Sequence, residues 1–170
     1  MDVAALTVAT VSIVLAAAAL TWQVLTFLFT GARVKAELQV GAMGSSGVAI
    51  GPPSTAMTPQ ALAEQDFDTP VLAVRVRNIG RMSVNVERVA IRLEPSKLEF
   101  RIDWGPNPTM PYRLEPQSSA LWYFQFQQVL ALGRTAVSSG VSQVPNVAHG
   151  RAHLGSGKRV DTPERITLPT

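Results

Sequence analysis

The N-terminal thirty residues contain an apolar run that few soluble folds could accommodate. Residues 3–30, VAALTVATVSIVLAAAALTWQVLTFLFT, occupy 28 positions without a charged side chain. At about 1.5 Å per residue, a helix of this length would extend for roughly 42 Å, which exceeds the ~30 Å hydrocarbon core of a bilayer. A tilted span can absorb that excess length. A buried helix of a soluble domain would more often be shorter and carry a polar face, so the run predicts a membrane span.

The alternative of a cleaved signal peptide fits the flanks of this run poorly. A signal peptide has a basic N-terminal region, an apolar region of about 7–15 residues and a small-x-small cleavage site. Here Met1-Asp2 carries no basic side chain, the apolar run is longer, and Thr30-Gly31-Ala32 is a poor cleavage site. We therefore predict that residues 1–32 form a retained anchor.

The charges on either side of the span predict its orientation. Asp2 precedes it, whereas Arg33 and Lys35 follow it directly. Basic residues favour the cytoplasmic side, which predicts a C-terminal domain in the cytoplasm. The absence of cysteine fits a reducing compartment and also a disulfide-free exported domain, so it favours neither. Arginine outnumbers lysine twelve to three, a bias typical of GC-rich bacterial genomes, and the expected location is a bacterial cell membrane.

The charge of the chain beyond the span indicates which classes of partner it can bind. Residues 31–170 carry a net charge of +4, without a dense basic run or interleaved aromatic residues, which argues against nucleic acid. The expected partners are the lipid bilayer, through residues 3–30, and another membrane-associated protein, with a weak attraction to anionic headgroups beside the anchor. Small residues at helical spacing also predict a weak self-association of the span: Ala5, Ala9 and Ala17, with Ser12 and Ala16 beside them.

Beyond the anchor, the chain reads as short strands separated by turn signals. Residues 33–42 alternate with Val34, Ala36, Leu38 and Val40 on one face, GSSG marks a turn, and VAIG predicts a short return strand. Residues 52–70 contain four prolines and few large apolar side chains, so they predict a long surface loop, either functional or merely flexible.

Residues 72–93, LAVRVRNIGRMSVNVERVAIRL, predict a hairpin with one apolar face. Asn78 and Gly80 supply the turn, because both residue types tolerate positive φ. The inward parity changes near Glu87-Arg88, as a β-bulge would require. The expected inward residues are Val74, Val76, Val84, Val86, Val89 and Ile91, with Met82 in the same register, and the expected exposed residues are Arg75, Arg77, Arg88 and Arg92.

The rest of the chain continues the pattern of strands. LEFRI (98–102) and SALWYFQF (119–126) predict strands, the latter with Trp122 and Phe124 on one face and Tyr123 on the other. QQVLALGR predicts a short helix that ends at Gly133, and VAHGRAHL and KRVDTPERITL flank a GSG hairpin turn. Seven or eight such strands predict a Greek-key β-sandwich over residues 33–170.

The order of these segments resembles a known group. An uncharged span ending in Trp22-Gln23-Val24 and a basic flank precede VRVRN-x-G-R (74–81), YRLEP-x-S (112–118), a short VLAL helix and the VAHGRAHLGSGKRV hairpin. The chain is similar to small bacterial membrane proteins with one span and an immunoglobulin-like C-terminal domain. That resemblance implies a mainly β fold: one transmembrane helix, then an immunoglobulin-like antiparallel sandwich with one short helix. It implies no activity, and this chain has Gln117 where such proteins usually have glycine.

The sequence offers no convincing catalytic, cofactor-binding or metal-binding residues. GSGKR (155–159) lacks the glycine and the Ser/Thr of a phosphate-binding loop and fits a hairpin turn better. In a strand, His149 and His153 would lie on the same face about 13 Å apart, too far for one ion. No Gly-x-Ser-x-Gly motif is present, and the carboxylates lie where solvated acids are expected.

Two functions remain open at the level of the sequence. The first is a membrane-anchored, non-enzymatic interaction module. The alternative is a module outside the membrane that binds an envelope glycan or a small ligand, with Trp104, Tyr123 and the 52–70 loop as its site.

Overall fold

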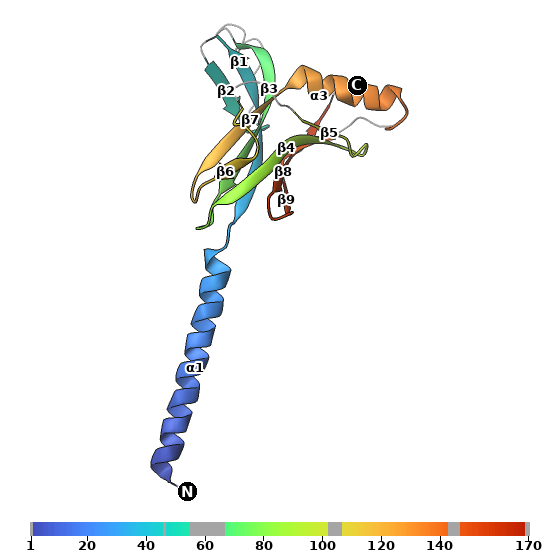
Figure 1. Cartoon of the computed structure of the whole chain (residues 1–170). Coiled ribbons are helices and arrows are strands. Elements are labelled where there is room, and N and C mark those ends of the chain that lie inside the picture. Colours follow the sequence, from blue (N-terminus) through green and yellow to red (C-terminus); the bar gives the residue numbers. More distant parts are fainter. Residues whose placement is uncertain (1, 46, 55–66, 102–106, 143–146, 169–170) are drawn as a thin grey trace.

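The computed structural model describes residues 2–45, 47–54, 67–101, 107–142 and 147–168. The chain forms one long N-terminal helix, α1 (Val3–Thr30), followed by strands in two antiparallel sheets and a second helix, α3 (Phe126–Ser138). Helix α1 projects from one end of the two-sheet domain (Figure 1).

In helix α1 hydroxyl side chains are hydrogen-bonded within the helix, and the apolar side chains described along it are exposed. It begins after Asp2, whose carboxylate accepts a hydrogen bond from the Ala4 N–H at 3.3 Å. Hydroxyl side chains along it donate to carbonyls four residues earlier, as Thr10 does to Leu6 and Thr21 to Ala17. The side chain of Ile13 is 70% exposed. By length and composition, residues Leu6–Thr26 are sufficient to cross a membrane.

The first sheet has the strand order β2-β1-β3-β7. Its strands are β1 (Val34–Gly44), β2 (Gly47–Gly51), β3 (Phe67–Asn78) and β7 (Ser119–Gln125). The predicted strand at 33–42 and its short return strand are confirmed. The predicted loop 52–70 is too long, because residues 67–70 already belong to β3 and pair with β1. Most of the remaining loop, residues 55–66, lies outside the described residues.

The second sheet is built on the pairing of β4 (Val84–Glu94) with β8 (Val147–Leu154). The short strands β5 (Glu99–Phe100) and β6 (Tyr112–Leu114) pair with β4, and β9 (Arg159–Asp161) and β10 (Ile166–Thr167) pair with β8. The predicted GSG hairpin is confirmed as the β8–β9 turn, in which the Leu154 N–H donates to the Lys158 carbonyl.

The predicted 72–93 hairpin is wrong in its pairing, because β3 lies in the first sheet and β4 in the second. Alternation indicates which face of a strand is buried but not which strand is its partner. The Asn78 side chain stabilises the crossing: its Nδ2 donates to the Met82 carbonyl at 2.7 Å, and its Oδ1 accepts from the Gly80 N–H at 3.0 Å. The turn therefore carries the chain between sheets.

Most of the predicted burial in this stretch is confirmed. All six expected inward residues are buried, and the register shift between Val86 and Arg88 confirms the bulge. Arg77 is exposed as expected. Met82, which shares the register of the inward residues, is 58% exposed. Three arginines that were expected to be solvated are only partly exposed, namely Arg75, Arg88 and Arg92.

The core lies between the two sheets and receives large side chains from both. Val74 and Val76 of β3 face Val86 and Ile91 of β4 within one cluster, which Trp122 and Phe124 of β7 join as predicted. Tyr112 packs edge-on against Trp122, with ring centroids 5.7 Å apart.

Helix α3 closes the end of the sandwich opposite α1 (Figure 1). Its buried stripe contains Val129, Leu130, Gly133 and Ala136, of which Val129 and Leu130 belong to the core cluster. The predicted end at Gly133 is wrong, because that glycine lies on the packed face. The helix ends instead before Gly140, which has a φ of +73° and so adopts the left-handed conformation typical of a helix C-terminus.

Candidate functional site

The outward side of β8 carries three polar side chains that are nevertheless buried. His149, Arg151 and His153 are 2%, 9% and 8% exposed. They alternate with Ala148, Gly150 and Ala152, which face the first sheet, because successive side chains of a strand point to opposite faces. Charged groups from β4, β5 and β9 surround them. We call the whole set the outer charge network: Arg88, Arg92, Glu94, Glu99, His149, Arg151, His153 and Asp161.

Arg151 is the centre of this network. Its Nε and Nη2 donate to the two carboxylate oxygens of Asp161 at 2.6 and 2.8 Å, and its Nη1 lies 3.3 Å from Glu99 Oε1. This bidentate pair lowers the pKa of Asp161 below its usual range and raises the pKa of Arg151. Both groups therefore stay charged at neutral pH.

Arg92 contacts Glu99 as well and brings one further carboxylate, Glu94, into the network. Its Nε donates to Glu94 Oε1 at 2.7 Å, and its Nη1 lies 3.5 Å from Glu99 Oε1. The hydrogen bond from Arg92 lowers the pKa of Glu94. Burial alone would raise the pKa of Glu99, but His153 and Arg151 outweigh burial and leave that pKa below its ordinary value.

His153 bridges an arginine and a carboxylate. Its Nδ1 lies 2.9 Å from Arg88 Nη2, and its Nε2 lies 3.4 Å from Glu99 Oε2. A guanidinium can only donate, so Nδ1 must accept and the ring proton must reside on Nε2. Burial first, and then the charge of Arg88, lower the pKa of His153. The ring is therefore neutral at neutral pH.

His149 is the less well satisfied of the two histidines. Within the described part of the chain its buried Nδ1 has no hydrogen-bond partner, and its Nε2 lies 4.0 Å from Asp161 Oδ2. Burial lowers the pKa of His149 despite the opposing charge of Asp161. A second proton here would place a buried positive charge among arginines.

The charges of the network are largely paired with one another. Its three arginines equal its three carboxylates in number, the more exposed Arg101 lies 4.0 Å from Glu99, and both histidines are neutral at neutral pH. Carboxylates held ionised by arginine are poor proton donors at neutral pH, so the arrangement suits ordered charge display better than acid–base chemistry. Among the described residues, no group of three histidine, cysteine, aspartate or glutamate side chains is placed to hold a metal ion.

Of the two aromatic residues predicted for a ligand site, only Tyr123 can be placed. It lies on the outward face of β7 and is partly buried. The Asn107 side chain pairs with its backbone, accepting from the Tyr123 N–H at 2.7 Å and donating to its carbonyl at 3.0 Å. Asn107 thus covers the free edge of β7 at this point. Trp104 lies outside the described residues.

The predicted flank charges Arg33 and Lys35 lie where α1 joins the domain, and both are exposed. The Ile79 N–H donates to the Arg33 carbonyl at 2.7 Å, so the β3–β4 loop is fastened to the segment that leaves α1. A side chain on Gly80 would clash with the backbone of residues 31–33. Other exposed basic residues lie at the same end, and we call the set the basic collar: Arg33, Lys35, Arg77, Arg81 and Lys158.

Sequence reasoning missed the outer charge network. It interpreted Arg88 and Arg92 as solvated, and it considered His149 and His153 only as a pair too far apart to share a metal ion. The signal was present in VAHGRAHL, where small residues alternate with His, Arg and His. Small inward residues let the sheets approach closely, while long outward side chains from adjacent strands can cover one another. Recognising this required knowing that β4 is the neighbour of β8.

Comparisons with known proteins leave the chain without a match: no family model, no curated protein and no solved structure matches it. Its function is therefore inferred from α1, the basic collar and the outer charge network.

Proposed function

We propose that this chain is a single-span membrane protein of a bacterial cell membrane, whose sandwich domain is a non-enzymatic interaction module in the cytoplasm. The observation that carries the proposal is α1, a 28-residue helix with exposed apolar side chains. Such a surface is unfavourable in water and favourable in lipid. The helix continues through only three residues into β1, so the domain is held close to the bilayer surface.

The strand order supports an immunoglobulin-like arrangement of the domain. In that fold the first, second and fifth strands share one sheet, and the third, sixth and seventh share the other. If β1, β3, β4, β7, β8 and β9 are taken as the strands called A, B, C, E, F and G, the pairings β1-β3-β7 and β9-β8-β4 reproduce A-B-E and G-F-C. Strand β2 is then an addition at the edge of the first sheet.

The basic collar supports the cytoplasmic orientation. Arg33 and Lys35 stand with three further exposed cations of the folded domain at the same end, whereas Asp2 is the charged side chain on the other side of α1. Glu115, in the β6–β7 turn at the collar end, is paired with Arg113 at 3.0 Å. Positive charge beside a span favours the cytoplasmic side, and anionic lipids there would add roughly 1 kcal/mol for each nearby basic residue.

The outer charge network supports recognition of another membrane-associated protein. Its side chains are already ordered by mutual pairing, so a partner would not have to immobilise them. Asp161 and Glu94 keep part of their carboxylates accessible, with side chains 45% and 30% exposed. A complementary partner surface would present hydrogen-bond donors opposite these groups. The span restricts such a partner to the vicinity of the membrane.

Weak self-association of α1 is a further part of the proposal. The hydroxyls of Thr7 and Ser12 are bonded within their own helix, so contact between two copies would depend on close packing of small residues rather than on hydrogen bonds across the interface.

Site-specific photo-crosslinking in the producing cells tests the interaction. A photoreactive amino acid at Arg159, beside His153 on the outward face of β9, should form a discrete adduct with a membrane-associated protein. The matched control is Arg77, another exposed arginine, on the outward face of β3. Adducts from both positions alike, or from neither, would contradict the assignment of this face. An adduct with an envelope component would instead favour the glycan- or ligand-binding alternative.

A further inference from the structure

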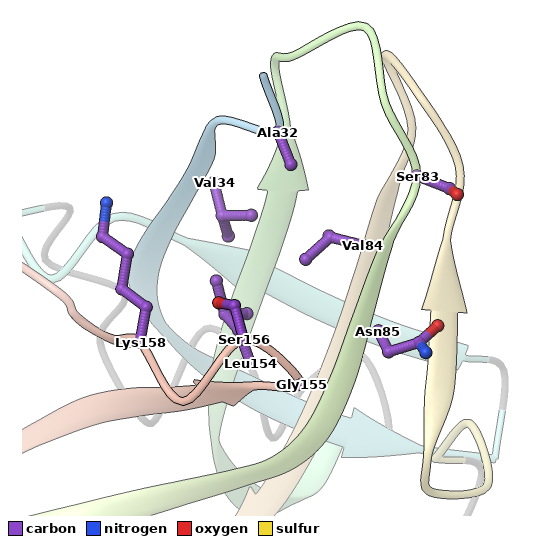
Figure 2. A pocket seen from close by; sticks show the side chains of 9 residues that line it. All are labelled: Ala32, Val34, Ser83, Val84, Asn85, Leu154, Gly155, Ser156 and Lys158. Carbon is purple, nitrogen blue, oxygen red and sulfur yellow. The ribbon is translucent and has the colours of Figure 1, made fainter.

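The loop between β3 and β4, residues 79–83, lies at the end of the sandwich where α1 joins. Figure 2 shows it running beside Ala32 before it enters β4. The Ile79 N–H donates to the Arg33 carbonyl at 2.7 Å, and a Cβ on Gly80 would lie only 2.5 Å from backbone atoms of the segment that leaves α1. The position of the loop relative to the end of α1 is therefore set by the fold.

This loop presents the most exposed large apolar side chain in the described part of the domain. Met82 is 58% exposed, and Arg81 beside it is also exposed and makes no ion pair with a described residue. Val141, at 55%, has a similar exposure but follows α3, which closes the opposite end. Single exposed apolar residues are common on protein surfaces, so the position of Met82 matters more than its exposure.

The length of α1 indicates the depth of the loop. If Leu6–Thr26 crosses the hydrocarbon core, the remaining turn of α1 extends about 6 Å beyond it, to Thr30. The headgroup layer adds roughly 5–8 Å on each side of the core. Gly80 packs against the residues that follow α1, and Met82 lies at most about 7 Å further along the loop. The loop is therefore within reach of the headgroups whenever α1 spans the membrane.

The charges around the loop favour an anionic lipid surface. Two carboxylates lie at this end of the domain: Glu115 is paired with Arg113 at 3.0 Å, and Glu87 lies beside Gly155. The cations of the basic collar, Arg81 among them, outnumber these two carboxylates. Positive charge close to a bilayer attracts anionic lipids, and a long basic side chain can reach headgroups while an apolar neighbour lies deeper.

We propose that residues 79–83 form a second membrane contact, in which Met82 inserts between the headgroups of anionic lipids and Arg81 binds their phosphates. Helix α1 and this loop together then hold the sandwich at a fixed tilt on the bilayer. The outer charge network keeps a constant orientation as a result, which suits recognition of a partner in the same membrane. This inference rests on the membrane span proposed above and adds an orientation of the domain to it.

Depth measurements on the full chain in vesicles test the contact. Because the chain has no cysteine, Met82→Cys and Val141→Cys each provide one site for a fluorophore, at similarly exposed apolar positions on opposite ends of the domain. The vesicles contain phosphatidylcholine, phosphatidylglycerol and a lipid with a spin-labelled headgroup. This lipid should quench the probe at position 82 and leave the probe at position 141 unquenched. Equal quenching of the two probes would overturn the contact.

A probe at Ser156→Cys, in the exposed β8–β9 turn, tests the loop residues without labelling them. Arg81→Gln should lower the ratio of docked to undocked domain about fivefold, the effect of one basic residue near an anionic surface. Met82→Asn should lower this ratio as well, whereas the matched control Val141→Asn should leave it unchanged. Equal effects of Met82→Asn and Val141→Asn would overturn the role of the loop. Each variant should keep the thermal unfolding midpoint of wild type, because the altered side chains are exposed.

Two further outcomes separate failure of the span from failure of the loop contact. If the wild-type chain does not float with the vesicles, the membrane span itself is overturned. Flotation with equal quenching at positions 82 and 141 would overturn only the loop contact. Protection of position 82 from an aqueous quencher in native membranes, but not in the vesicles, would overturn the lipid assignment in favour of contact with a protein.

Discussion

Helix α1 and strand β8 both depart from the usual pattern of buried apolar and exposed polar side chains. In α1 the apolar side chains are exposed, with Ile13 at 70%, whereas in β8 the outward polar side chains are buried, with His149 at 2%. Exposed apolar side chains are unfavourable in water, and buried charges are unfavourable unless they are paired. The exposed apolar side chains described along α1 support the proposed lipid environment. Buried charge indicates that each ion has found a partner, as Arg151 has in Asp161 and Glu99.

Under the proposed function, the contrast separates two kinds of contact surface. The contacts of α1 would be unspecific, because lipid tails make no directional contacts. The outer charge network is directional, since each hydrogen bond fixes the orientation of a side chain. The proposed function places anchoring in α1 and recognition in the second sheet, and the two can be disrupted separately.

The largest effect is expected from placing an unpaired charge in the core between the sheets. Val76 is fully buried, so Val76→Asp should unfold the domain, at a cost on the order of 4–5 kcal/mol or more. The neighbouring exposed residue offers a control, and Arg77→Gln should change stability by less than about 0.5 kcal/mol. Urea unfolding of the full chain in detergent, followed by near-UV circular dichroism, measures both. Similar midpoints for the two variants would contradict the assigned core.

Removal of the central arginine of the network should be the next largest effect. Arg151→Ala leaves Glu99 and Asp161 without their main partner and should cost about 3 kcal/mol, at the lower end for buried pairs because Asp161 is partly exposed. Arg113→Ala breaks the exposed pair with Glu115 and should cost less than about 1 kcal/mol. If the two losses were equal in the same urea assay, the network would not be buried in solution.

The two sheets approach closely at Gly150, so a side chain added there should lower the stability of the domain by an intermediate amount. A Cβ at this position would lie 2.7 Å from Val74 Cγ2 and 2.8 Å from Thr162 Cγ2. Gly150→Ala should therefore destabilise the domain by about 1–3 kcal/mol. Gly31→Ala is the matched control, because nothing lies within 4 Å of that Cβ and the change should be nearly neutral. A neutral Gly150→Ala in thermal denaturation would show that the sheets can separate there without cost.

The smallest effect is a dependence of stability on pH. The pKa values of His149 and His153 are lower in the folded state, so the unfolded chain binds more protons once the pH falls below about 6.5. The free energy of unfolding should therefore decrease with falling pH, as the pH approaches the folded-state pKa values. The lowered pKa values of Glu94, Glu99 and Asp161 should add a second loss below about pH 4.5.

Thermal unfolding midpoints measured across this pH range separate the two stages. The double variant His149→Gln with His153→Gln should lose the upper stage and keep the lower one. A profile unchanged by this double substitution would show that other groups cause the upper stage.

Local patterns in the sequence predicted faces and turns but not which strands are neighbours. Alternation gave the inward residues of β3 and β4 correctly, because one face of each strand is buried whichever partner it has. It could not show that Asn78 carries the chain to the second sheet. Similarly, Gln117 departs from the glycine expected by resemblance, yet its φ of 58° keeps the left-handed conformation of that turn.

The same limit explains what was missed at the candidate site. Arg88 and Arg92 were predicted to be solvated because each strand was considered separately. Their partial burial arises from the register of β4 with β8, which places Arg88 opposite His153 and Arg92 opposite His149. The flank charges Arg33 and Lys35 were predictable because they depend on adjacent sequence alone. Lys158 joins them only through the folded β8–β9 turn.

The central claim, a membrane span with its domain in the cytoplasm, is tested most directly by a single cysteine in this cysteine-free chain. Ser139 is exposed after α3, so Ser139→Cys should leave the fold intact and present a reactive thiol. The variant is expressed in bacterial cells and treated with a membrane-impermeant maleimide. The account predicts that the membrane fraction contains the protein and that labelling occurs only after the cells are permeabilised. Labelling of intact cells would contradict the cytoplasmic orientation, and recovery of the protein in the soluble fraction would contradict the span.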